Sequence, residues 1–242
     1  ADPARPRFIV EAPIPGGHSS RVAAGGDGNL PSPAARQLFP LSPLWRWRKA
    51  HTMTSELKTV TIPFGPQDLR LETGRLAKQA DASVVATIGG TTLLVAVTVS
   101  DQPREGADFF PLMVDYREKF YASGRIPGGF FKREGRPGDA ETLKARLIDR
   151  AIRPLFPEGL RNEVMVYVTV VSSDNENPAD VAAFNATSAA LQISSIPFAT
   201  ATAAVRIGYI DGEYVLNPTY EQQKESSLDL IVAGTRNALN MV

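Results

Sequence analysis

The chain has 242 residues, 43% of them hydrophobic, and its 26 Lys+Arg balance its 26 Asp+Glu. This length allows one large domain or two small ones, and no stretch approaches the roughly 20 apolar residues that span a bilayer. The chain has no Cys, which excludes disulfides and thiolate sites, and both its histidines, His18 and His51, precede residue 53. Residues 53–242 alone therefore cannot form a Ser-His-Asp triad or a His-ligated zinc site.

Residues 1–52 do not have the pattern of a packed domain. They contain eight of the 19 prolines, few apolar residues, and seven Lys+Arg against three acidic residues. We expect a disordered or non-native leader, vector-derived or translated from upstream, followed by one domain at 53–242. An organelle transit peptide is the alternative, because such segments are Arg-rich and acid-poor.

Alternating and continuous apolar segments predict about eight strands in the domain. Gly89-Gly90 and Asp211-Gly212 are expected to be the turns of two hairpins. Pro111 places its strand at a sheet edge or a bulge, and the run at 163–172 predicts a strand covered on both faces. The expected strands are 58–64, 83–88, 92–99, 109–116, 163–172, 203–210, 213–216 and 228–233.

Two helices are expected among these strands. Asp139 is a suitable N-cap for a helix that runs to about Ile152 and ends before Pro154. Asn177 is expected to cap a second helix that runs to about Ser194. Two helices amid eight strands predict an α+β fold with helices packed on a sheet.

Positive charge is concentrated in one part of the neutral chain. Residues 116–161 contain 11 Lys+Arg and six Asp+Glu. This local excess predicts one anionic partner, such as a nucleic acid, although a solvated surface would give the same count.

The first predicted helix carries a row of three arginines. At 100° per residue, Arg146, Arg150 and Arg153 lie within about 60° of one another, beside an apolar face. Guanidinium groups suit bidentate phosphate contacts. Asp149 lies one helical turn from Arg146 and Arg153, so structural ion pairing is an equal alternative.

The loop before this helix combines glycines, basic residues and two adjacent aromatic residues. Phe130 and Phe131 follow Gly128-Gly129 and precede Lys132 and Arg133. Aromatic faces stack on unpaired bases while cations hold the backbone, which favours RNA contact. The alternative is that one Phe anchors the loop in the core and the other packs on a partner subunit.

The sequence lacks several other functional signatures. It has neither a phosphate-binding Gly-x4-Gly-Lys-[Ser/Thr] segment nor a glycine fingerprint of a dinucleotide fold. Asp174, Glu176 and Asp180 cluster at the start of the second helix. Helix capping and loop solvation are their expected roles, in preference to metal binding.

Long strings in this chain resemble the first ribonuclease-PH-type domain of the bacterial polynucleotide phosphorylase family. They are ASGRIPGGFFKREGRP at 122–137 and RLIDRAIRPLFPEG at 146–159, with shorter matches at 206–209, 216–219 and 229–235. The resemblance extends from about Leu57 to the end. It implies a ribonuclease-PH-like fold, with mixed β-sheet layers and two helices packed on them.

The resemblance also implies an activity and partners. The family's enzyme is a phosphate-dependent 3′→5′ exoribonuclease that releases nucleoside diphosphates from single-stranded RNA, with inorganic phosphate as co-substrate and Mg²⁺ as cofactor. The expected assembly is a homotrimeric ring in the cytoplasm that does not bind a membrane. Proteins of an RNA-degradation complex are its expected further partners. The family's RNA-binding loop maps onto Phe130, Phe131, Lys132, Arg133 and Arg136. Its substrate path maps onto Arg146, Arg150 and Arg153.

The catalytic residues of the family have no full counterpart here. Its active second domain carries Asp-x5-Asp-x-Lys, and the matching positions here are Gln223, Asp229 and Ile231. One carboxylate and no lysine cannot form a comparable Mg²⁺ site. We therefore expect no catalytic or metal site on this chain. The second domain, which would bind the Mg²⁺, and the helical, KH and OB-fold modules are expected to be absent from it.

Two alternative functions stay open at this stage. The first is a non-catalytic RNA-binding ring or scaffold subunit, whose parent protein would have no Asp-x5-Asp-x-Lys domain. The second is a single-domain phosphorolytic ribonuclease, which the degenerate positions and the Phe-Phe loop disfavour.

Overall fold

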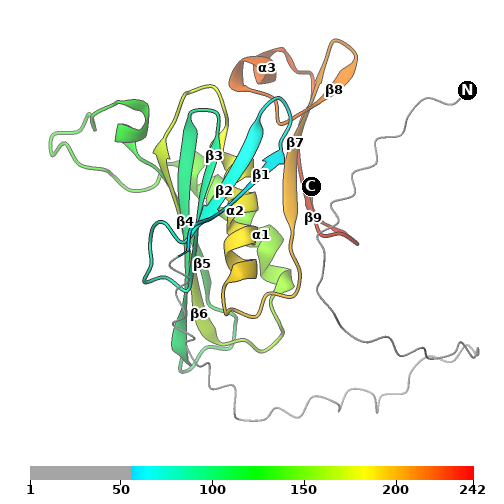
Figure 1. Ribbon diagram of the computed structural model, residues 1–242. Helices are drawn as coiled ribbons and strands as arrows, with labels where there is room; N and C mark the ends of the chain where they lie inside the picture. Colours follow the sequence, from blue (N-terminus) through cyan, green and yellow to red (C-terminus); the bar gives the residue numbers. More distant parts are fainter. Residues whose placement is uncertain (1–55) are drawn as a thin grey trace, which may run out of the picture. The chain divides into compact units, whose positions relative to one another are not determined.

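The computed structural model describes residues 56–242, so the predicted leader at 1–52 lies outside the described residues. Residues 56–242 form two β-sheets with two long helices between them (Figure 1). The strands are β1 Lys58–Pro63, β2 Asp68–Thr73, β3 Ala82–Ile88, β4 Thr91–Pro103, β5 Leu112–Glu118, β6 Asn162–Ser172, β7 Ala203–Ile210, β8 Glu213–Leu216, β9 Asp229–Gly234 and β10 Leu239–Met241. The helices are α1 Asp139–Ile152, α2 Ala179–Ile193 and α3 Tyr220–Glu225, with 3-10 turns η2 Phe120–Ser123 and η3 Arg153–Leu155. No helix in this range has the length and apolar character of a membrane span.

The larger sheet has the strand order β1-β2-β3-β4-β6-β5, and the smaller one β10-β9-β7-β8. All neighbouring strands are antiparallel except β5 and β6, which run parallel. The prediction of an α+β fold with mixed sheet layers is therefore confirmed. So is the edge position of the strand after Pro111, because β5 is the last strand of its sheet.

Both predicted hairpin turns are confirmed. Gly89-Gly90 connects β3 to β4, and Asp211-Gly212 connects β7 to β8. Gly89 has a φ of +54°, and a Cβ there would lie 2.5 Å from the side-chain nitrogen of Asn177. The turn therefore requires glycine both for its backbone conformation and for its close packing.

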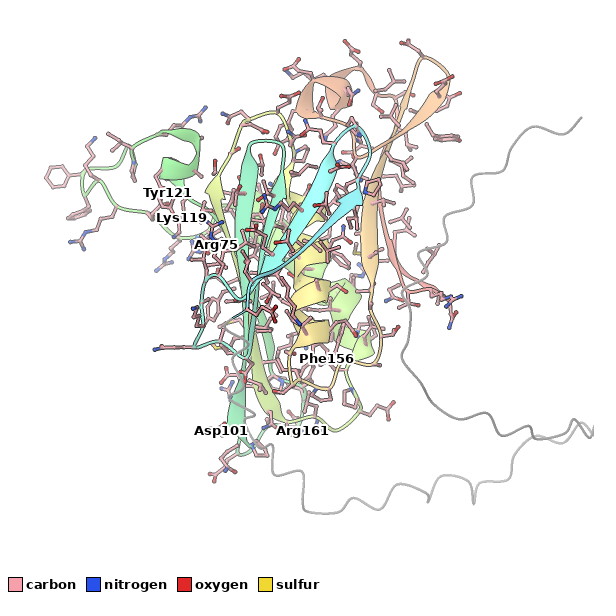
Figure 2. The ribbon with its side chains drawn as sticks, viewed as in Figure 1. Arg75, Asp101, Lys119, Tyr121, Phe156 and Arg161 are labelled. Carbon is pink, nitrogen blue, oxygen red and sulfur yellow. The ribbon has the colours of Figure 1, made fainter. Side chains whose placement is uncertain are left out.

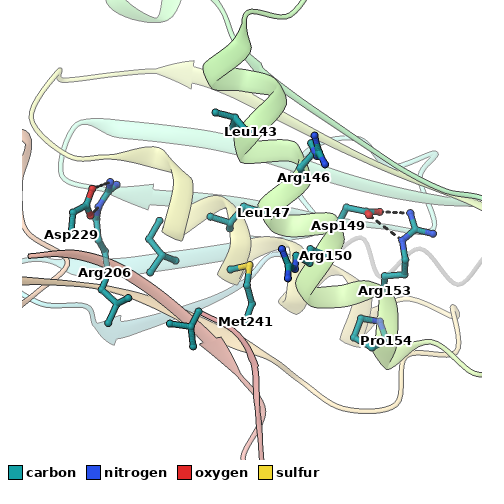
Figure 3. Close-up of a pocket in the computed structure, with 13 residues that line it drawn as sticks. Leu143, Arg146, Leu147, Asp149, Arg150, Arg153, Pro154, Arg206, Asp229 and Met241 are labelled. Atoms are coloured by element: carbon teal, nitrogen blue, oxygen red, sulfur yellow. Dashed lines mark hydrogen bonds and ion pairs between the residues drawn. The ribbon is translucent and has the colours of Figure 1, made fainter.

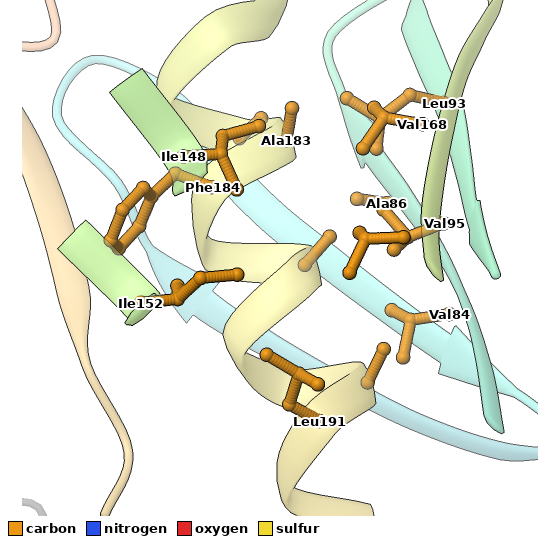
Figure 4. Close-up of a cluster of buried hydrophobic side chains, with 14 of the residues drawn as sticks. Val84, Ala86, Leu93, Val95, Ile148, Ile152, Val168, Ala183, Phe184 and Leu191 are labelled. Atoms are coloured by element: carbon orange, nitrogen blue, oxygen red, sulfur yellow. The ribbon is translucent and has the colours of Figure 1, made fainter. Parts of the chain in front are cut away.

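Helix α2 forms the centre of the core, because it is covered on several sides at once. Eleven of its 15 residues are buried, many of them alanines whose small side chains allow neighbouring elements to approach closely. Figure 4 shows Val84, Leu93 and Val95 of the larger sheet facing α2, and Ile148 and Ile152 of α1 covering another side. The core is thus a continuous apolar layer between the sheet and the two helices.

Polar contacts attach α2 to the smaller sheet. The side-chain amide of Asn185 donates to the carbonyl of Ala204 in β7 at 2.9 Å, and its oxygen accepts from the Ala204 N–H at 3.1 Å. Ser188 accepts from the N–H of Thr202, whose hydroxyl donates to the carbonyl of Gly234. These pairs fix how β7 and β9 lie against the helix.

Three details differ from the sequence-based predictions. Strand β6 is not covered on both faces, since burial alternates along it and Tyr167 and Val171 are 39% and 36% exposed. Helix α2 begins at Ala179, because the Asn177 side chain donates to Asp174 instead of capping the helix. Helix α1 follows an N-cap at Gly138, so Asp139 is its first residue. The elements β2, α3 and β10 were not predicted.

Candidate nucleic-acid interface

A pocket of about 1030 Å³ lies between α1 and the smaller sheet, and we call it the arginine pocket (Figure 3). Apolar side chains, including Leu147, Ile231 and Met241, form part of its wall. The charged residues of the wall are Arg146, Asp149, Arg150, Arg153, Arg206 and Asp229. The pocket therefore brings together the predicted arginine row and two of the three degenerate catalytic positions.

The three arginines of the predicted row, two on α1 and Arg153 at the start of η3, have different environments. Arg146 and Arg150 are exposed, and neither takes part in an ion pair within residues 56–242. Arg153 binds Asp149 through two hydrogen bonds of 2.6 and 3.0 Å, and donates to the carbonyls of Phe110 and Leu112. The alternative of structural ion pairing thus applies to Arg153, whereas Arg146 and Arg150 are available to a ligand.

Arg206 of β7 links two carboxylates at the opposite wall of the pocket. Its Nε and Nη2 donate to the two oxygens of Asp229 at 2.6 and 2.8 Å, and its Nη1 donates to Asp180 at 2.8 Å. The Arg206 guanidinium holds the pKa of Asp229 below its ordinary value. The hydrogen bond to Asp229 in turn raises the pKa of Arg206. Asp180 is therefore an ion-pair partner and has no solvating role in the loop.

The degenerate catalytic positions do not fit a Mg²⁺ site. Both carboxylate oxygens of Asp229 accept from Arg206, and Ile231 offers no ligand atom. Gln223 lies on α3, where its amide donates to the carbonyl of Pro218. In the part of the chain that the structure describes, no group of three or more His, Cys, Asp or Glu could hold a metal ion. A divalent cation would have to displace a guanidinium, so this pocket favours anions.

Asp174 has the loop-stabilising role expected for the acidic residues before α2. Its carboxylate accepts from the N–H of Gly90 and the hydroxyl of Thr91, and from N–H groups of Glu176 and Asn177. Burial alone would raise the pKa of Asp174, but these hydrogen bonds hold it well below its usual range. Asp174 thereby joins the β3–β4 turn to the start of α2.

We call residues 119–138 the aromatic loop. It extends away from the larger sheet, and Figure 2 labels Lys119 and Tyr121 near its base. Phe130 and Phe131 are 94% and 80% exposed, with their rings edge to face at a centroid distance of 5.4 Å. The alternative that one Phe anchors the loop in the core is therefore wrong. The loop presents two unburied aromatic faces beside Lys132.

Two features of this region were not identified from the sequence. One is Arg206, whose only signal was a charge within an apolar strand. The other is a contact set in which the buried Tyr116 and the half-buried Lys144 both donate to Glu118. Burial and the neighbouring Glu118 raise the pKa of Tyr116. Burial lowers the pKa of Lys144, but its hydrogen bond to Glu118 and the negative charges near it, Glu118 first, together outweigh this and raise the pKa overall.

Comparisons with known proteins agree with the geometry. Residues 66–197 match the model of the 3′ exoribonuclease family, domain 1, and residues 200–242 match domain 2 of the same family. A polyribonucleotide nucleotidyltransferase of Rhodopseudomonas palustris (strain BisB5) is 57% identical over 184 residues, and one of Methylocella silvestris is 56% identical over 187. These alignments cover 76% and 77% of this chain and 26% of each relative. The chain thus spans about a quarter of the length of these relatives.

A solved structure supports the fold at much lower sequence identity. The crystal structure of rice (Oryza sativa) Rrp46 superposes with a TM-score of 0.58 and 18% identity. The superposition covers 74% of this chain and 79% of that chain. At this identity, the likeness concerns the fold alone.

The Arg206 bridge predicts that substitutions of Arg206 and of Asp229 lower the free energy of unfolding by different amounts. Arg206→Met should lower the free energy of unfolding by about 3–5 kcal/mol, because it leaves Asp180 buried and unpaired. Asp229→Asn should cost less than about 1 kcal/mol, because Asp229 is 59% exposed whereas Asp180 is 8% exposed. Urea denaturation at pH 7 measures both. An Asp229 effect as large as that of Arg206 would contradict this account of the bridge.

Proposed function

This chain belongs to the 3′ exoribonuclease family, and on that basis we propose that it is the RNA-guiding, ring-building part of a phosphate-dependent 3′→5′ exoribonuclease. The whole protein would release nucleoside diphosphates from single-stranded RNA, as a polyribonucleotide nucleotidyltransferase. The observation that carries the proposal is the aromatic loop, which exposes Phe130 and Phe131 on a glycine-rich and basic segment. Two exposed aromatic rings beside cations suit unpaired bases and their phosphates.

The second support is the arginine pocket. Arg146 and Arg150 project from α1 without acidic partners among the described residues. The acidic residue of the opposite wall, Asp229, is paired with Arg206. A guanidinium can bind phosphate oxygens in pairs, so these two arginines suit the RNA backbone or inorganic phosphate. Arg153 is excluded from this role because its donors already bind Asp149 and two carbonyls. Lys132, Arg133 and Arg136 of the aromatic loop would add backbone contacts.

Catalysis is assigned to a part of the protein outside this chain. Phosphorolysis requires positive groups where charge develops on the transferring phosphoryl oxygens, and Mg²⁺ would supply part of that charge. Among the degenerate positions here, Asp229 supplies the only carboxylate, and both of its oxygens accept hydrogen bonds from Arg206. Mg²⁺ and inorganic phosphate would therefore bind to another ribonuclease-PH-type domain, which carries the catalytic site. The proposal includes a homotrimer, a cytoplasmic location and contacts with other RNA-degrading proteins.

Of the two alternatives, the structure disfavours one and the relatives disfavour the other. A single-domain phosphorolytic ribonuclease would need its metal site in this pocket, where Asp229 is already paired. A non-catalytic scaffold or ring subunit fits the structure of this chain equally well. The relatives named polyribonucleotide nucleotidyltransferase favour an enzyme as the parent protein.

We expect this chain to bind 5′-labelled oligo(A) without shortening it. With Mg²⁺ and phosphate present, no nucleoside diphosphate should be released, because both carboxylate oxygens of Asp229 are already bound by Arg206. Gel analysis of the labelled RNA measures shortening, and fluorescence anisotropy at two salt concentrations measures binding. Phosphate-dependent shortening would mean that Gln223, Asp229 and Ile231 do belong to an active site.

The aromatic loop predicts a loss of RNA affinity when its rings are removed. Phe130→Ala with Phe131→Ala should weaken oligo(A) binding by about 1–3 kcal/mol for each stacked ring removed, with an unchanged melting temperature, because both rings are exposed. Phe109→Ala is the matched control, since Phe109 is also exposed but lies outside the loop. Equal affinity of the double variant and the control would remove the loop from the RNA interface.

The arginines of α1 and Arg153, which follows them in η3, should separate into two classes. Arg146→Ala with Arg150→Ala should weaken RNA binding and reduce its salt dependence, by about 0.7 in the log–log slope for each phosphate that is no longer neutralised. The double variant should keep its melting temperature. Arg153→Ala should instead lower the melting temperature, since Asp149 and the carbonyls of Phe110 and Leu112 lose their donor. The assignment is wrong if Arg153→Ala affects only RNA binding.

A further inference from the structure

The base of the aromatic loop is closed by one carboxylate. The loop leaves β5 after Glu118 and joins α1 after Gly138, so these two residues mark its ends. Glu141, in the first turn of α1, accepts from the N–H of Glu118 at 2.8 Å with Oε1. It accepts from the N–H of Gly138 at 2.7 Å with Oε2. A single side chain thus holds both ends of the loop together.

Further contacts tie the two limbs of the loop to each other. Glu134, on the returning limb, accepts from the N–H of Phe120 on the outgoing limb at 3.0 Å. Arg117 of β5 donates to the carbonyl of Gly135 at 3.4 Å. The outgoing limb is also held independently, because Ser173 donates its N–H to the carbonyl of Ala122. The returning limb therefore depends most on Glu134 and Glu141.

The tip of the loop has little support of its own. A Cβ added at Gly128, Gly129 or Gly135 would meet no heavy atom within 4 Å. Phe130 and Phe131 contact each other and remain exposed. The direction in which the two rings point is consequently set at the base of the loop.

We propose that Glu141 is a positioning residue that aims the aromatic loop at single-stranded RNA. The inference rests on the proposed function, in which the loop contacts RNA. Glu141 lies on the same helix as Arg146 and Arg150, less than three turns before Arg150. By binding the loop to the first turn of α1, it holds the aromatic rings at a fixed place relative to the arginine pocket. Stacking and phosphate contacts can then be made by one strand of RNA.

The role requires a carboxylate. Each oxygen of Glu141 accepts from a different N–H, and its negative charge is favoured at the N-terminus of a helix. A glutamine has one acceptor oxygen, so its NH₂ group would face one of the two N–H donors. Glu141→Gln therefore releases one end of the loop while it keeps the length of the side chain.

The test is a double-mutant cycle in the full chain, with oligo(A) affinity as the readout. Glu141→Gln alone should weaken binding roughly 10-fold, as expected when one charge-assisted hydrogen bond is removed. In the Phe130→Ala, Phe131→Ala background it should cause no further loss, since it acts through those rings. Glu221→Gln is the matched control, because Glu221 is an exposed first-turn glutamate of α3 that pairs only with Lys224 among the described residues. Its affinity should equal that of the unmodified chain.

Limited trypsin digestion gives a readout without RNA. Cleavage after Lys132 or Arg133 should be faster in Glu141→Gln than in Glu221→Gln. Additive losses in the cycle, or unchanged cleavage, would overturn the positioning role while leaving RNA contact by the loop intact. A Phe130→Ala, Phe131→Ala variant with full affinity would overturn both proposals. If Glu141→Gln does not fold, Glu134→Ala tests whether the contacts at the base of the loop aim the rings, because it removes another of these contacts without altering α1. Unchanged affinity would then overturn the positioning role.

Discussion

The ion pairs of Arg206 form the charged link between the central helix α2 and the smaller sheet, beside the neutral contacts of Asn185 and Ser188. One guanidinium, largely shielded from water, binds Asp180 at the start of α2 and Asp229 at the start of β9. The central helix and the smaller sheet are thereby held at one distance, and the arginine pocket opens beside the contact. The same bridge uses both oxygens of the carboxylate that a metal would need. A single interaction thus links α2 to the smaller sheet and engages both carboxylate oxygens of Asp229 in the pocket.

Helix α1 connects the features to which the proposed function assigns RNA contact. Its first turn holds the aromatic loop through Glu141, its middle exposes Arg146 and Arg150, and its end is fastened to the approach of β5 by Arg153. Both of its ends are therefore anchored, and the exposed arginines lie between the anchors. In the proposed function, a helix anchored at both ends would hold its cationic groups in place before RNA binds, which would lower the entropic cost of binding.

Local signals in the sequence predicted the local structure well. The turns at Gly89-Gly90 and Asp211-Gly212 are specified by their own residues, and α1 could be bounded by its N-terminal acids and Pro154. The pairing of Arg206 was not predictable, because Asp180 and Asp229 approach it only in the folded chain. Asn177 is a residue type that is common at helix N-caps, but its side chain donates to Asp174 and so does not cap α2. The open face of β6 was missed because an apolar run does not reveal which neighbours cover it.

The strand order has a consequence for how the chain folds. Strands β1 to β4 form a meander of local hairpins. Strand β4 then pairs with β6, although β5, the aromatic loop and α1 lie between them in the sequence. Because β5 pairs only with β6, its place does not exist until β6 arrives. Such long-range pairing raises the contact order and slows folding, and it leaves the β4 edge open in the meantime. The aromatic loop is therefore anchored late, so incompletely folded chains, which are prone to edge-to-edge association, do not yet carry the ordered loop that we propose contacts RNA.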